Sequence, residues 1–426
     1  MRHFPQIAAL DSRPCPGPSL AGPTRVLLLL QSLSGGGAER VAVNIANHCD
    51  PAAVDVRLGL MKRAGPYLAE IDPDRVLGGA APWGIAAMIR ASRAQVLMTF
   101  GMDTELLAWP ALRTLGSARP SWICRGDSNP DAEIDKLPIG PVGRAAVTAA
   151  MRRIHRSADG VVAVAKDLAD RIDDQSRARS RRARVIYNPV DIARVERFAV
   201  QRPWSDAARP FVVAAGRLVR QKGFDLLIRA FADSEAARGM DLVILGEGPL
   251  ESELRAQAAG LGIAGRVRFV GFQSNPWAWF ARARLFVLPS RWEGFGNVVA
   301  EALACGAPTL VTDCDFGPRE QVVHGLSGWV ARSEDAGALT AALDTLLGDP
   351  ALAAALGAAG RMRARAFDVA AIAGAYTRLF REHAALREAR HREFEMAANP
   401  PAGLSTLEFG PGANVELSGG SPSRHG

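Results

Sequence analysis

Short apolar runs alternate with glycine-containing turns and amphipathic stretches along most of the chain. This alternation predicts parallel βαβ units, in which each strand is followed by a helix. In the first half the apolar runs span residues 25–30, 54–60, 96–99, 121–124 and 160–164. In the second half they span residues 211–215, 242–245, 267–270, 285–288 and 308–312. Because continuous apolar runs are typical of strands buried on both faces, the pattern predicts an α/β protein with two doubly wound, Rossmann-like domains.

The pattern changes at both ends of the chain. At the start, a short apolar patch is followed by charged residues and prolines, which predicts a disordered leader and not a signal peptide. From residue 336 onward apolar residues recur every three or four positions, which predicts helices, and a Gly/Pro/Ser-rich tail follows them. The predicted organisation is a leader at 1–24, an N-terminal domain at 25–188, a linker at 189–210, a C-terminal domain at 211–365, crossing helices at 366–396 and a disordered tail at 397–426.

Composition narrows the class of protein. A chain of 426 residues is too long for one ordinary core. Its 5 cysteines are scattered, without a CxxC motif or a Cys/His cluster, which favours free thiols in a reducing compartment and argues against a structural zinc. No apolar stretch near the start approaches the ~20 residues of a spanning helix. These features together predict a cytoplasmic protein.

The net charge of +7 is concentrated between residues 151 and 184, which are rich in arginine. One interpretation is a solvated loop, and the other is a patch for anionic lipid headgroups at the inner face of a membrane. Nucleic acid is not expected as a partner, because no aromatic residue stands between these arginines as a stacking platform. The predicted membrane-facing arginines are Arg177, Arg179, Arg181, Arg182 and Arg184.

The most informative stretch is residues 289–308. A buried strand ends near Ser290, a loop carries Glu293, and a helix begins near Asn297 and ends at Gly306. Unpaired amides in the first turn of such a helix form an anion site, and open α/β sheets bind ligands at this edge. Two carboxylates beside it, Glu293 and Glu301, suit the hydroxyls of a ribose and of a sugar. The amides expected at the anion site belong to Phe295, Gly296, Asn297 and Val298.

A second cluster follows the first strand of the second half. Gly216 and Gly223 frame a loop that places the cations Arg217 and Lys222 close together. A departing nucleoside diphosphate accumulates negative charge, so fixed cations stabilise the transition state more than the ground state. Either cation alone would be an ordinary surface residue, but the two clusters share one sheet edge. We therefore predict that Arg217, Lys222 and Glu293 are catalytic.

These residues resemble the retaining glycosyltransferases of family 4, from about Arg25 to Phe380. The family's pair of glutamates is present as Glu293 and Glu301. The resemblance implies the GT-B fold, in which two Rossmann-like domains face each other across a cleft and the last helix crosses back to the first domain. It also implies front-face chemistry, in which the departing phosphate helps to deprotonate the acceptor.

The resemblance also implies roles for individual residues. Glu301 would hold the donor ribose, and Glu293 would face the transferred sugar. Arg217 and Lys222 would clamp the diphosphate. The backbone around Phe272 and Gln273 would contact the nucleobase.

A glycine loop follows the opening strand of the first half. Gly36 and Gly37 lie in a stretch similar to the family's loop, which passes close to donor phosphate and acceptor. The rival interpretation is a dinucleotide fingerprint, but Arg40 stands where its third glycine belongs. A dehydrogenase is therefore disfavoured.

The sequence departs from the family in lacking a histidine in the first domain against the donor sugar. The corresponding region offers Arg125, Asp127 and Asn129 as candidates for sugar or acceptor contacts. His155 and His324 are expected to be structural.

Metal use is not expected either. Two Asp-x-Asp patterns, at residues 72–74 and 313–315, are of a kind that holds manganese in other transferases. Arg217 and Lys222 already supply the charge that a metal would bring, so neither a metal nor another cofactor is predicted.

The sequence thus predicts a transferase that moves a hexose or N-acetylhexosamine from a nucleotide-sugar donor, with UDP as the expected nucleotide. The expected acceptor is a saccharide or a lipid-linked saccharide in bacterial glycan synthesis. The alternatives are an epimerase or phosphorylase of the same fold, and a scaffold without catalysis.

Overall fold

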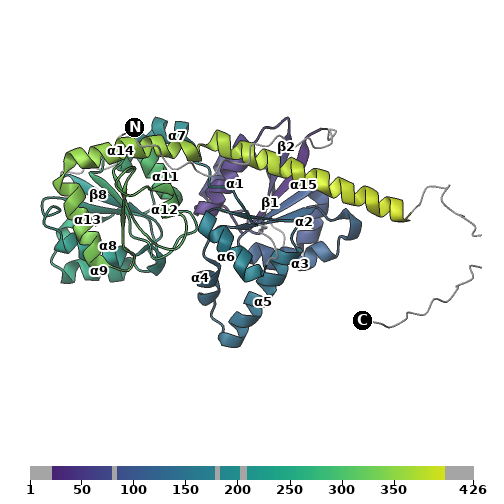
Figure 1. The fold of residues 1–426 in the computed structure, drawn as a ribbon, viewed down its shortest axis with the longest axis horizontal. Helices are drawn as coiled ribbons and strands as arrows, with labels where there is room; N and C mark the ends of the chain where they lie inside the picture. The colour runs from purple at the N-terminus through teal and green to yellow at the C-terminus, as the bar shows by residue number, and fades with distance from the viewer. Residues whose placement is uncertain (1–21, 79–83, 178–182, 202–208, 399–426) are drawn as a thin grey trace, which may run out of the picture. The chain divides into compact units, whose positions relative to one another are not determined.

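The structure is a computed structural model that describes residues 22–78, 84–177, 183–201 and 209–398 (Figure 1). The predicted leader and tail lie outside the described residues, except at their inner borders. The strands form two parallel sheets: one of 7 strands in the order β3-β2-β1-β4-β5-β6-β7, and one of 6 strands in the order β10-β9-β8-β11-β12-β13. The predicted pair of Rossmann-like sheets is confirmed.

The first sheet contains every strand predicted for the first half, and two short edge strands that were not predicted. Edge strands β3 and β7 have only three residues each, so their sequence carries too little alternation to reveal them. The strands are β1 Thr24–Leu30, β2 Val54–Leu60, β3 Val76–Gly78, β4 Val96–Phe100, β5 Ser121–Gly126, β6 Gly160–Ala163 and β7 Ala183–Val185.

The second sheet repeats this topology around its central strands β8 and β11. Its last strand, β13, was missed for the same reason as the other edge strands, since it is short and partly exposed. The strands are β8 Phe211–Ala215, β9 Asp241–Leu245, β10 Val267–Phe269, β11 Leu285–Leu288, β12 Thr309–Thr312 and β13 Trp329–Ala331.

Helices cover the first sheet. Helices α2, α3, α5 and α6 pack in a row as successive neighbours. The α-helices of this half are α1 Gly37–His48, α2 Ile85–Ser92, α3 Met102–Arg113, α4 Pro130–Asp135, α5 Pro141–Ser157 and α6 Lys166–Ser176.

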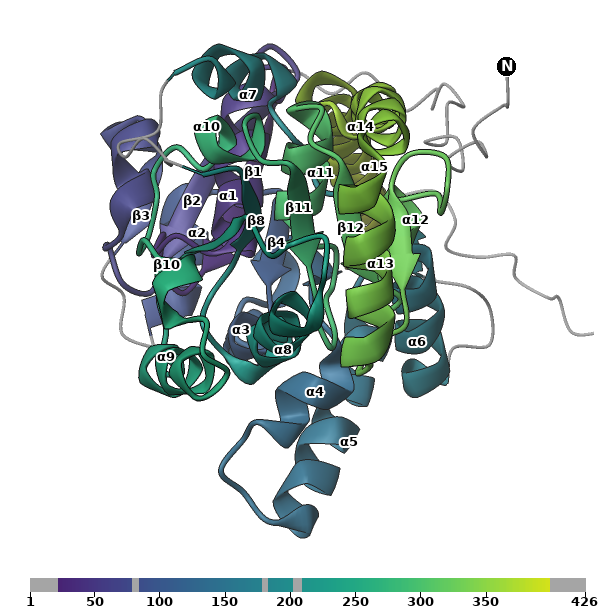
Figure 2. The same cartoon turned by 90° about the vertical axis from the view of Figure 1, so that its left-hand side faces the viewer.

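In the second half, α8 packs between α9 and α13, while α11 packs against α10 and α14 (Figure 2). An apolar core made of residues such as Val212, Phe231 and Leu343 joins strands to α8 and α13. The α-helices are α8 Phe224–Asp233, α9 Glu251–Gly260, α10 Trp277–Phe280, α11 Asn297–Ala304, α12 Pro318–Gln321, α13 Ala336–Gly348 and α14 Pro350–Ala364.

Short 3-10 helices complete the connections. Two of them matter for the site, η1 after β2 and η5 after β8. Their bounds are η1 Pro66–Glu70, η2 Pro73–Arg75, η4 Gly116–Ala118, η5 Arg220–Lys222, η6 Ala264–Arg266 and η7 Arg365–Phe367.

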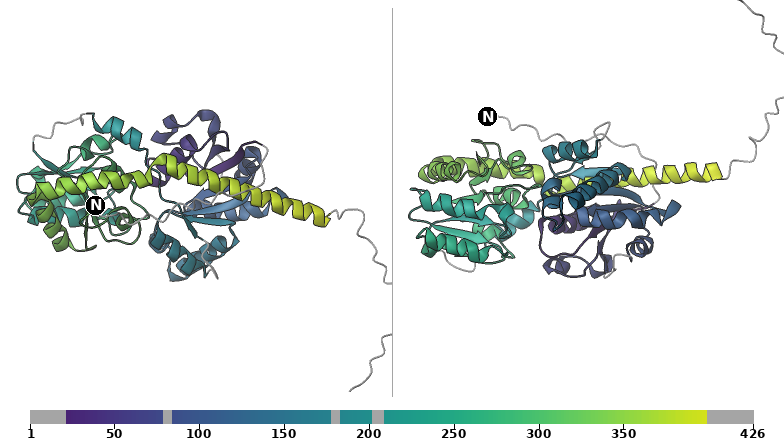
Figure 3. Two further views of the ribbon diagram at one scale, coloured as in Figure 1. Left: turned by 45° about the horizontal axis from the view of Figure 1, so that its top comes forward. Right: turned by 90° about the horizontal axis from the view of Figure 1, so that it is seen from below.

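The chain crosses between the two sheets twice. The first crossing contains α7 (Ile192–Ala199), a helix within the predicted linker 189–210, whose N-terminus is capped by Asp191. The second crossing leads into α15 (Val369–Ala398), which is one continuous helix (Figure 3). The two crossings pair with each other at a bridge between Val190 and Asp368.

Helix α15 returns to the first sheet, as predicted. The ring Nδ1 of His383 lies 2.9 Å from the Ser121 hydroxyl at the start of β5. Tyr376 and Phe380 are fully buried and belong to the same apolar core as β1 and β5. The last helix is therefore part of the core of the first half.

Among the described residues, no single helix has the length and hydropathy needed to cross a membrane. One pair, 336–348 and 350–367, meets that test only when taken together across a bend of 98°.

Candidate active site

The predicted catalytic residues Lys222 and Glu293 are in contact. Lys222 Nζ lies 2.5 Å from Glu293 Oε1, and the Ser290 hydroxyl donates to the same oxygen at 2.7 Å. Glu293 is buried, with 5% of its surface exposed. The sequence predicted separate roles for the two residues, whereas the structure makes them one ion pair at the carboxyl edge of β11.

Gly223 allows this pair to form. It ends η5 with a φ of 64°, in the left-handed region. A Cβ at this position would lie 2.1 Å from the carbonyl oxygen of Pro289, at the end of β11. Glycine is therefore required for the loop after β8 to approach the loop that carries Glu293.

Arg217 differs from Lys222. Its side chain is exposed, and it follows Gly216, whose φ is 155°. Among the residues that the structure describes, the Arg217 side chain has no hydrogen-bond or ion-pair partner, while its backbone carbonyl accepts from the Val219 amide. It is the predicted catalytic cation that remains available for an anionic ligand.

Helix α11 begins where it was predicted to begin, at Asn297. Its N-cap is Gly296, with φ 82° and no side-chain cap, so the first-turn amides of Asn297 and Val298 are open. Phe295, just before the cap, is buried, and its carbonyl accepts a hydrogen bond from Gln321. The N-terminus of α11 is thus held rigidly while its amides stay free for an anion.

Glu301 lies one turn further along α11. The indole Nε1 of Trp277 donates to Glu301 Oε2 at 3.1 Å. Burial raises the pKa of Glu301, against the lowering effect of the indole. The carboxylate is therefore oriented by Trp277, a residue that the sequence analysis did not single out.

The two residues predicted near the nucleobase, Phe272 and Gln273, follow β10. The Phe272 side chain is 49% exposed, and its amide donates to Glu247 Oε1 at 3.3 Å. The Gln273 side chain donates to the Val270 carbonyl at 2.8 Å. Only the Phe272 ring is therefore presented outward.

The glycine loop of the first half meets these elements. Gly36 is the N-cap of α1 and Gly37 is its first residue. The side-chain amide of Asn297 donates to the Gly37 carbonyl at 3.0 Å. The predicted donor residues of both halves thus contact each other directly.

A group of residues beside this contact was missed from the sequence. Glu70, at the end of η1, pairs with Arg40 at 2.6 Å and also with Arg194 of α7. Although burial acts to raise it, hydrogen bonds from Arg40 and Arg194 lower the pKa of Glu70 to about 2. The Arg40 guanidinium also lies 3.7 Å from the centre of the Tyr67 ring. The only sequence signal here was Arg40, in the place of a fingerprint glycine.

The three candidates for sugar or acceptor contacts have different surroundings. Arg125 is fully buried at the end of β5, and Asn129 caps α4 by accepting from the amides of residues 131 and 132. Asp127 lies 3.3 Å from Arg125, and burial raises its pKa to about 6 despite that cation. Arg125 and Asn129 thus have internal partners, and a sugar-binding role for any of the three stays a prediction.

Asp127 also lies close to the loop that carries Glu293. A Cβ on Gly294 would stand 1.9 Å from the Asp127 carbonyl oxygen. Gly294 does not have a positive φ, so this glycine is required for space and not for backbone conformation.

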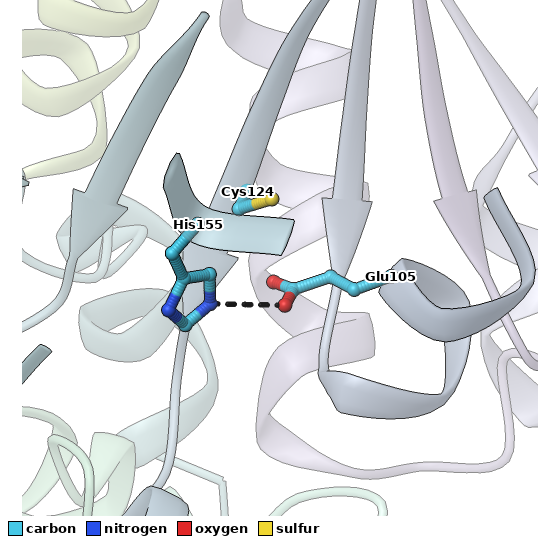
Figure 4. Close-up of side chains that lie close together, drawn as sticks. All are labelled: Glu105, Cys124 and His155. Carbon is cyan, nitrogen blue, oxygen red and sulfur yellow. Dashed lines mark hydrogen bonds and ion pairs between the residues drawn. The ribbon is translucent and has the colours of Figure 1, made fainter. Parts of the chain in front are cut away.

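His155, which the sequence predicted to be structural, is buried between helices of the first half (Figure 4). Its Nε2 lies 3.1 Å from Glu105 Oε2, and this contact joins α5 to α3. Cys124 of β5 lies beside them, and burial raises the pKa of its thiol. Ligand atoms of all three residues lie within 4.8 Å of one another, so this buried group could hold a metal ion. In the structure, the His155 imidazole and the Glu105 carboxylate are hydrogen-bonded to each other.

Other residues considered from the sequence make local contacts. The His324 ring packs against the Trp329 ring at a tilt of 54°, with ring centres 4.4 Å apart. In the two Asp-x-Asp patterns, Asp72 accepts from the amide of Asp74, and Asp313 accepts from the amide of Ser333 at 2.6 Å.

The arginine-rich stretch is only partly described. Arg177 ends α6 in a left-handed conformation, with φ 51°. Arg184 pairs with Glu382 at 2.9 Å. The other predicted membrane contacts, Arg179, Arg181 and Arg182, lie outside the described residues.

The fold and the site define a two-domain α/β protein with a cationic and carboxylate-rich site at the carboxyl edge of its second sheet. Residues 35–194 match the family described as Glycosyltransferase Family 4, and residues 198–363 match that described as Glycosyl transferases group 1. The chain belongs to the glycosyltransferases of the GT-B fold.

Several characterised proteins are similar to this chain. A Campylobacter jejuni N-acetylgalactosamine-N,N'-diacetylbacillosaminyl-diphospho-undecaprenol 4-alpha-N-acetylgalactosaminyltransferase is 33% identical over 45% of this chain and 52% of its own length. The lipopolysaccharide core biosynthesis glycosyltransferase LpsD of Rhizobium meliloti is 28% identical over 81% of this chain and 95% of its own length. The first of these matches thus spans about half of the relative, and the second nearly all of it.

Solved structures with a similar fold are also known. The Anabaena protein Alr3699/HepE, crystallised with UDP, superposes with a TM-score of 0.68 at 22% identity. The match covers 82% of this chain and 97% of that one. This likeness confirms the predicted GT-B fold.

Proposed function

We propose that this protein is a retaining glycosyltransferase that uses a nucleotide-diphosphate sugar. The observation that carries the proposal is the Lys222–Glu293 ion pair, with the exposed Arg217 on the same sheet edge as the open N-terminus of α11. As the bond between the sugar and the diphosphate breaks, negative charge develops on the leaving phosphate. Arg217, Lys222 and the α11 amides stabilise that charge.

The proposed donor is a UDP-hexose or a UDP-N-acetylhexosamine. The proposed acceptor is a saccharide or lipid-linked saccharide in bacterial glycan synthesis, at the cytoplasmic face of the membrane. In support, the Campylobacter relative is named for transfer of an N-acetylgalactosaminyl group to a diphospho-undecaprenol-linked saccharide, and the Anabaena structure contains UDP. In the retaining step, the acceptor oxygen bonds to the anomeric carbon on the face that the diphosphate leaves, and its proton passes to the departing phosphate oxygen.

The first test is donor use. Among UDP-, GDP- and ADP-sugars, we expect UDP-hexoses or UDP-N-acetylhexosamines to raise the melting temperature, because a ligand that binds only the folded state stabilises it.

We expect transfer to a lipid-linked saccharide to survive EDTA, since Arg217 and Lys222 replace a metal.

Other outcomes would contradict parts of this proposal. Turnover of donor without any acceptor would indicate an epimerase, and dependence on free phosphate would indicate a phosphorylase. Activity lost in EDTA and restored by manganese would overturn the metal-free mechanism.

We propose that the arginine-rich stretch assists docking at anionic lipid. Replacing Arg179, Arg181 and Arg182 together by glutamine is expected to release the protein from vesicles that contain phosphatidylglycerol, since each basic residue contributes about 1 kcal/mol near such a surface. Donor binding should be unchanged. Sedimentation with vesicles measures the release from lipid, and titration with UDP measures donor binding. Equal sedimentation of the variant and the wild type would refute the role.

A further inference from the structure

A line of hydrogen bonds runs from the last helix to the glycine loop of the first half. The Arg125 Nε donates to the Tyr376 hydroxyl at 3.2 Å, and its NH2 donates to Asn188 Oδ1 at 2.5 Å. The Asn188 Nδ2 donates to Asn297 Oδ1 at 2.7 Å, and the Asn297 Nδ2 donates to the Gly37 carbonyl at 3.0 Å. We call these five residues the amide relay. It ends at two residues predicted to bind the donor.

The direction of every bond in the amide relay follows from its first donor. A guanidinium has only N–H groups, so the atom of Asn188 that faces Arg125 must be its oxygen. The other side of Asn188 is then an NH2 group, which requires an oxygen on Asn297. The remaining NH2 of Asn297 must therefore face the Gly37 carbonyl. One buried cation thus sets the orientation of two side-chain amides in series.

Burial makes this orientation firm. Arg125 is 0% exposed and Asn188 is 6% exposed. Turning the Asn188 amide over would direct its NH2 at the guanidinium and leave buried donors without acceptors. Such a loss carries the desolvation penalty of each unsatisfied group, about 1–3 kcal/mol. Asn297, at the half-buried end, lies between the Asn188 NH2 group and the Gly37 carbonyl, and both partners require the same orientation of its amide.

The contact at Gly37 has a chemical consequence for an anion. A carbonyl oxygen repels phosphate, whereas amide N–H groups attract it. The Asn297 NH2 group holds the Gly37 carbonyl, while the Asn297 backbone amide lies in the open first turn of α11. Asn297 therefore does two things for an anionic ligand. Its side chain binds the Gly37 carbonyl oxygen, which would repel the anion, and its backbone N–H remains available to attract it.

We infer that Asn188 is a positioning residue for the donor site, acting through Asn297 to hold the glycine loop against the N-terminus of α11. This inference rests on the proposed function. Asn188 belongs to the segment between the two halves and touches neither the catalytic ion pair nor Arg217. It determines how the residues that bind the diphosphate are arranged.

Asn188→Asp tests the inference with almost no change in shape. Aspartate still accepts from Arg125 but has no NH2 for Asn297, so the Asn297 amide turns over and its oxygen faces the Gly37 carbonyl. Loss of that bond is expected to weaken UDP binding about tenfold, as 1.4 kcal/mol would. The KM for the UDP-sugar should rise by a similar factor, with a smaller change in kcat. Isothermal titration with UDP and steady-state kinetics measure these changes.

Asn44→Ala is the matched control. The Asn44 side chain is also buried and donates to the Pro189 carbonyl at 3.1 Å, one residue from Asn188, but it is not part of the amide relay. We expect this variant to lose stability and keep UDP affinity within threefold. Equal losses of affinity in the Asn44 and Asn188 variants would show that Asn188 only stabilises the segment, and would overturn the inference.

Asn297→Ala completes the design if the Asn188 variant does not fold. It leaves the buried Arg125–Asn188 pair intact and should also weaken UDP binding about tenfold. Combined with Asn188→Asp, it should add little further loss, because both changes break the same contact. Unchanged affinity in Asn297→Ala, or fully additive losses, would refute the amide relay. If the wild type binds neither UDP, GDP nor ADP, the proposed function itself fails, and this inference fails with it.

Discussion

Lys222→Met is expected to lower kcat/KM for glycosyl transfer by about 10²–10³-fold, the loss typical of one preorganised electrostatic group. The substitution keeps the length of the side chain and removes the cation proposed to stabilise the leaving diphosphate. Glu293 keeps its hydrogen bond from Ser290. Initial rates over a range of donor concentrations measure the effect, which should fall mainly on kcat.

Arg220→Met is the matched control for this experiment. Arg220 is an exposed cation in the same short helix, η5, and removing it changes the net charge equally. Its variant should keep activity within threefold of the wild type. A Lys222 variant that is folded by its melting curve and retains more than a tenth of the activity would contradict the proposed role.

Gly294→Ala is expected to have the second largest effect. The added methyl group would meet the Asp127 carbonyl oxygen at 1.9 Å, a distance that no backbone can accept without moving. The loop carrying Glu293 must shift, and a displacement near 1 Å at a catalytic group lowers activity by roughly 10²-fold. Steady-state kinetics and a melting curve separate this loss from general unfolding.

Gly265→Ala serves as the control for the glycine change. A Cβ at Gly265 would have no heavy atom within 4 Å, and the residue also lies in the second half of the chain. It should leave activity and melting temperature near their original values. Wild-type activity in the Gly294 variant would show that the two loops do not need to be in contact for catalysis.

The long features of the fold could be predicted because each is encoded locally. Every predicted strand of four or more residues is present, since its apolar run records burial on both faces. Helix α11 begins at Asn297, as the glycines before it indicated. The strands that were missed, β3, β7 and β13, are edge strands of three residues, as is β10, which was predicted only because its apolar run extends to residue 270.

The candidate site also contains residues that could be predicted from local motifs and contacts that could not. Arg217, Lys222 and Glu293 could be proposed from the sequence because each lies in a short motif next to a strand end, and the structure places Lys222 and Glu293 in contact. The partners of Arg125 could not, because Asn188 and Tyr376 lie 63 and 251 residues away in sequence. Its buried position and its two internal partners therefore came only from the structure, and its sugar-binding role stays a prediction. The contacts of Tyr67 with Arg40 and of Trp277 with Glu301 could not be predicted for the same reason, since they depend on packing between separate elements.

The return of α15 to the first sheet has a consequence for the order of events during synthesis. Tyr376 and Phe380 pack in an apolar core that includes the strands of the first sheet, such as β1 and β5. That half therefore waits, incomplete, until its last helix has left the ribosome. The second half, whose sheet is built from residues 211–331, has all its strands much sooner. We therefore expect the half that is translated first to be the last to complete its core.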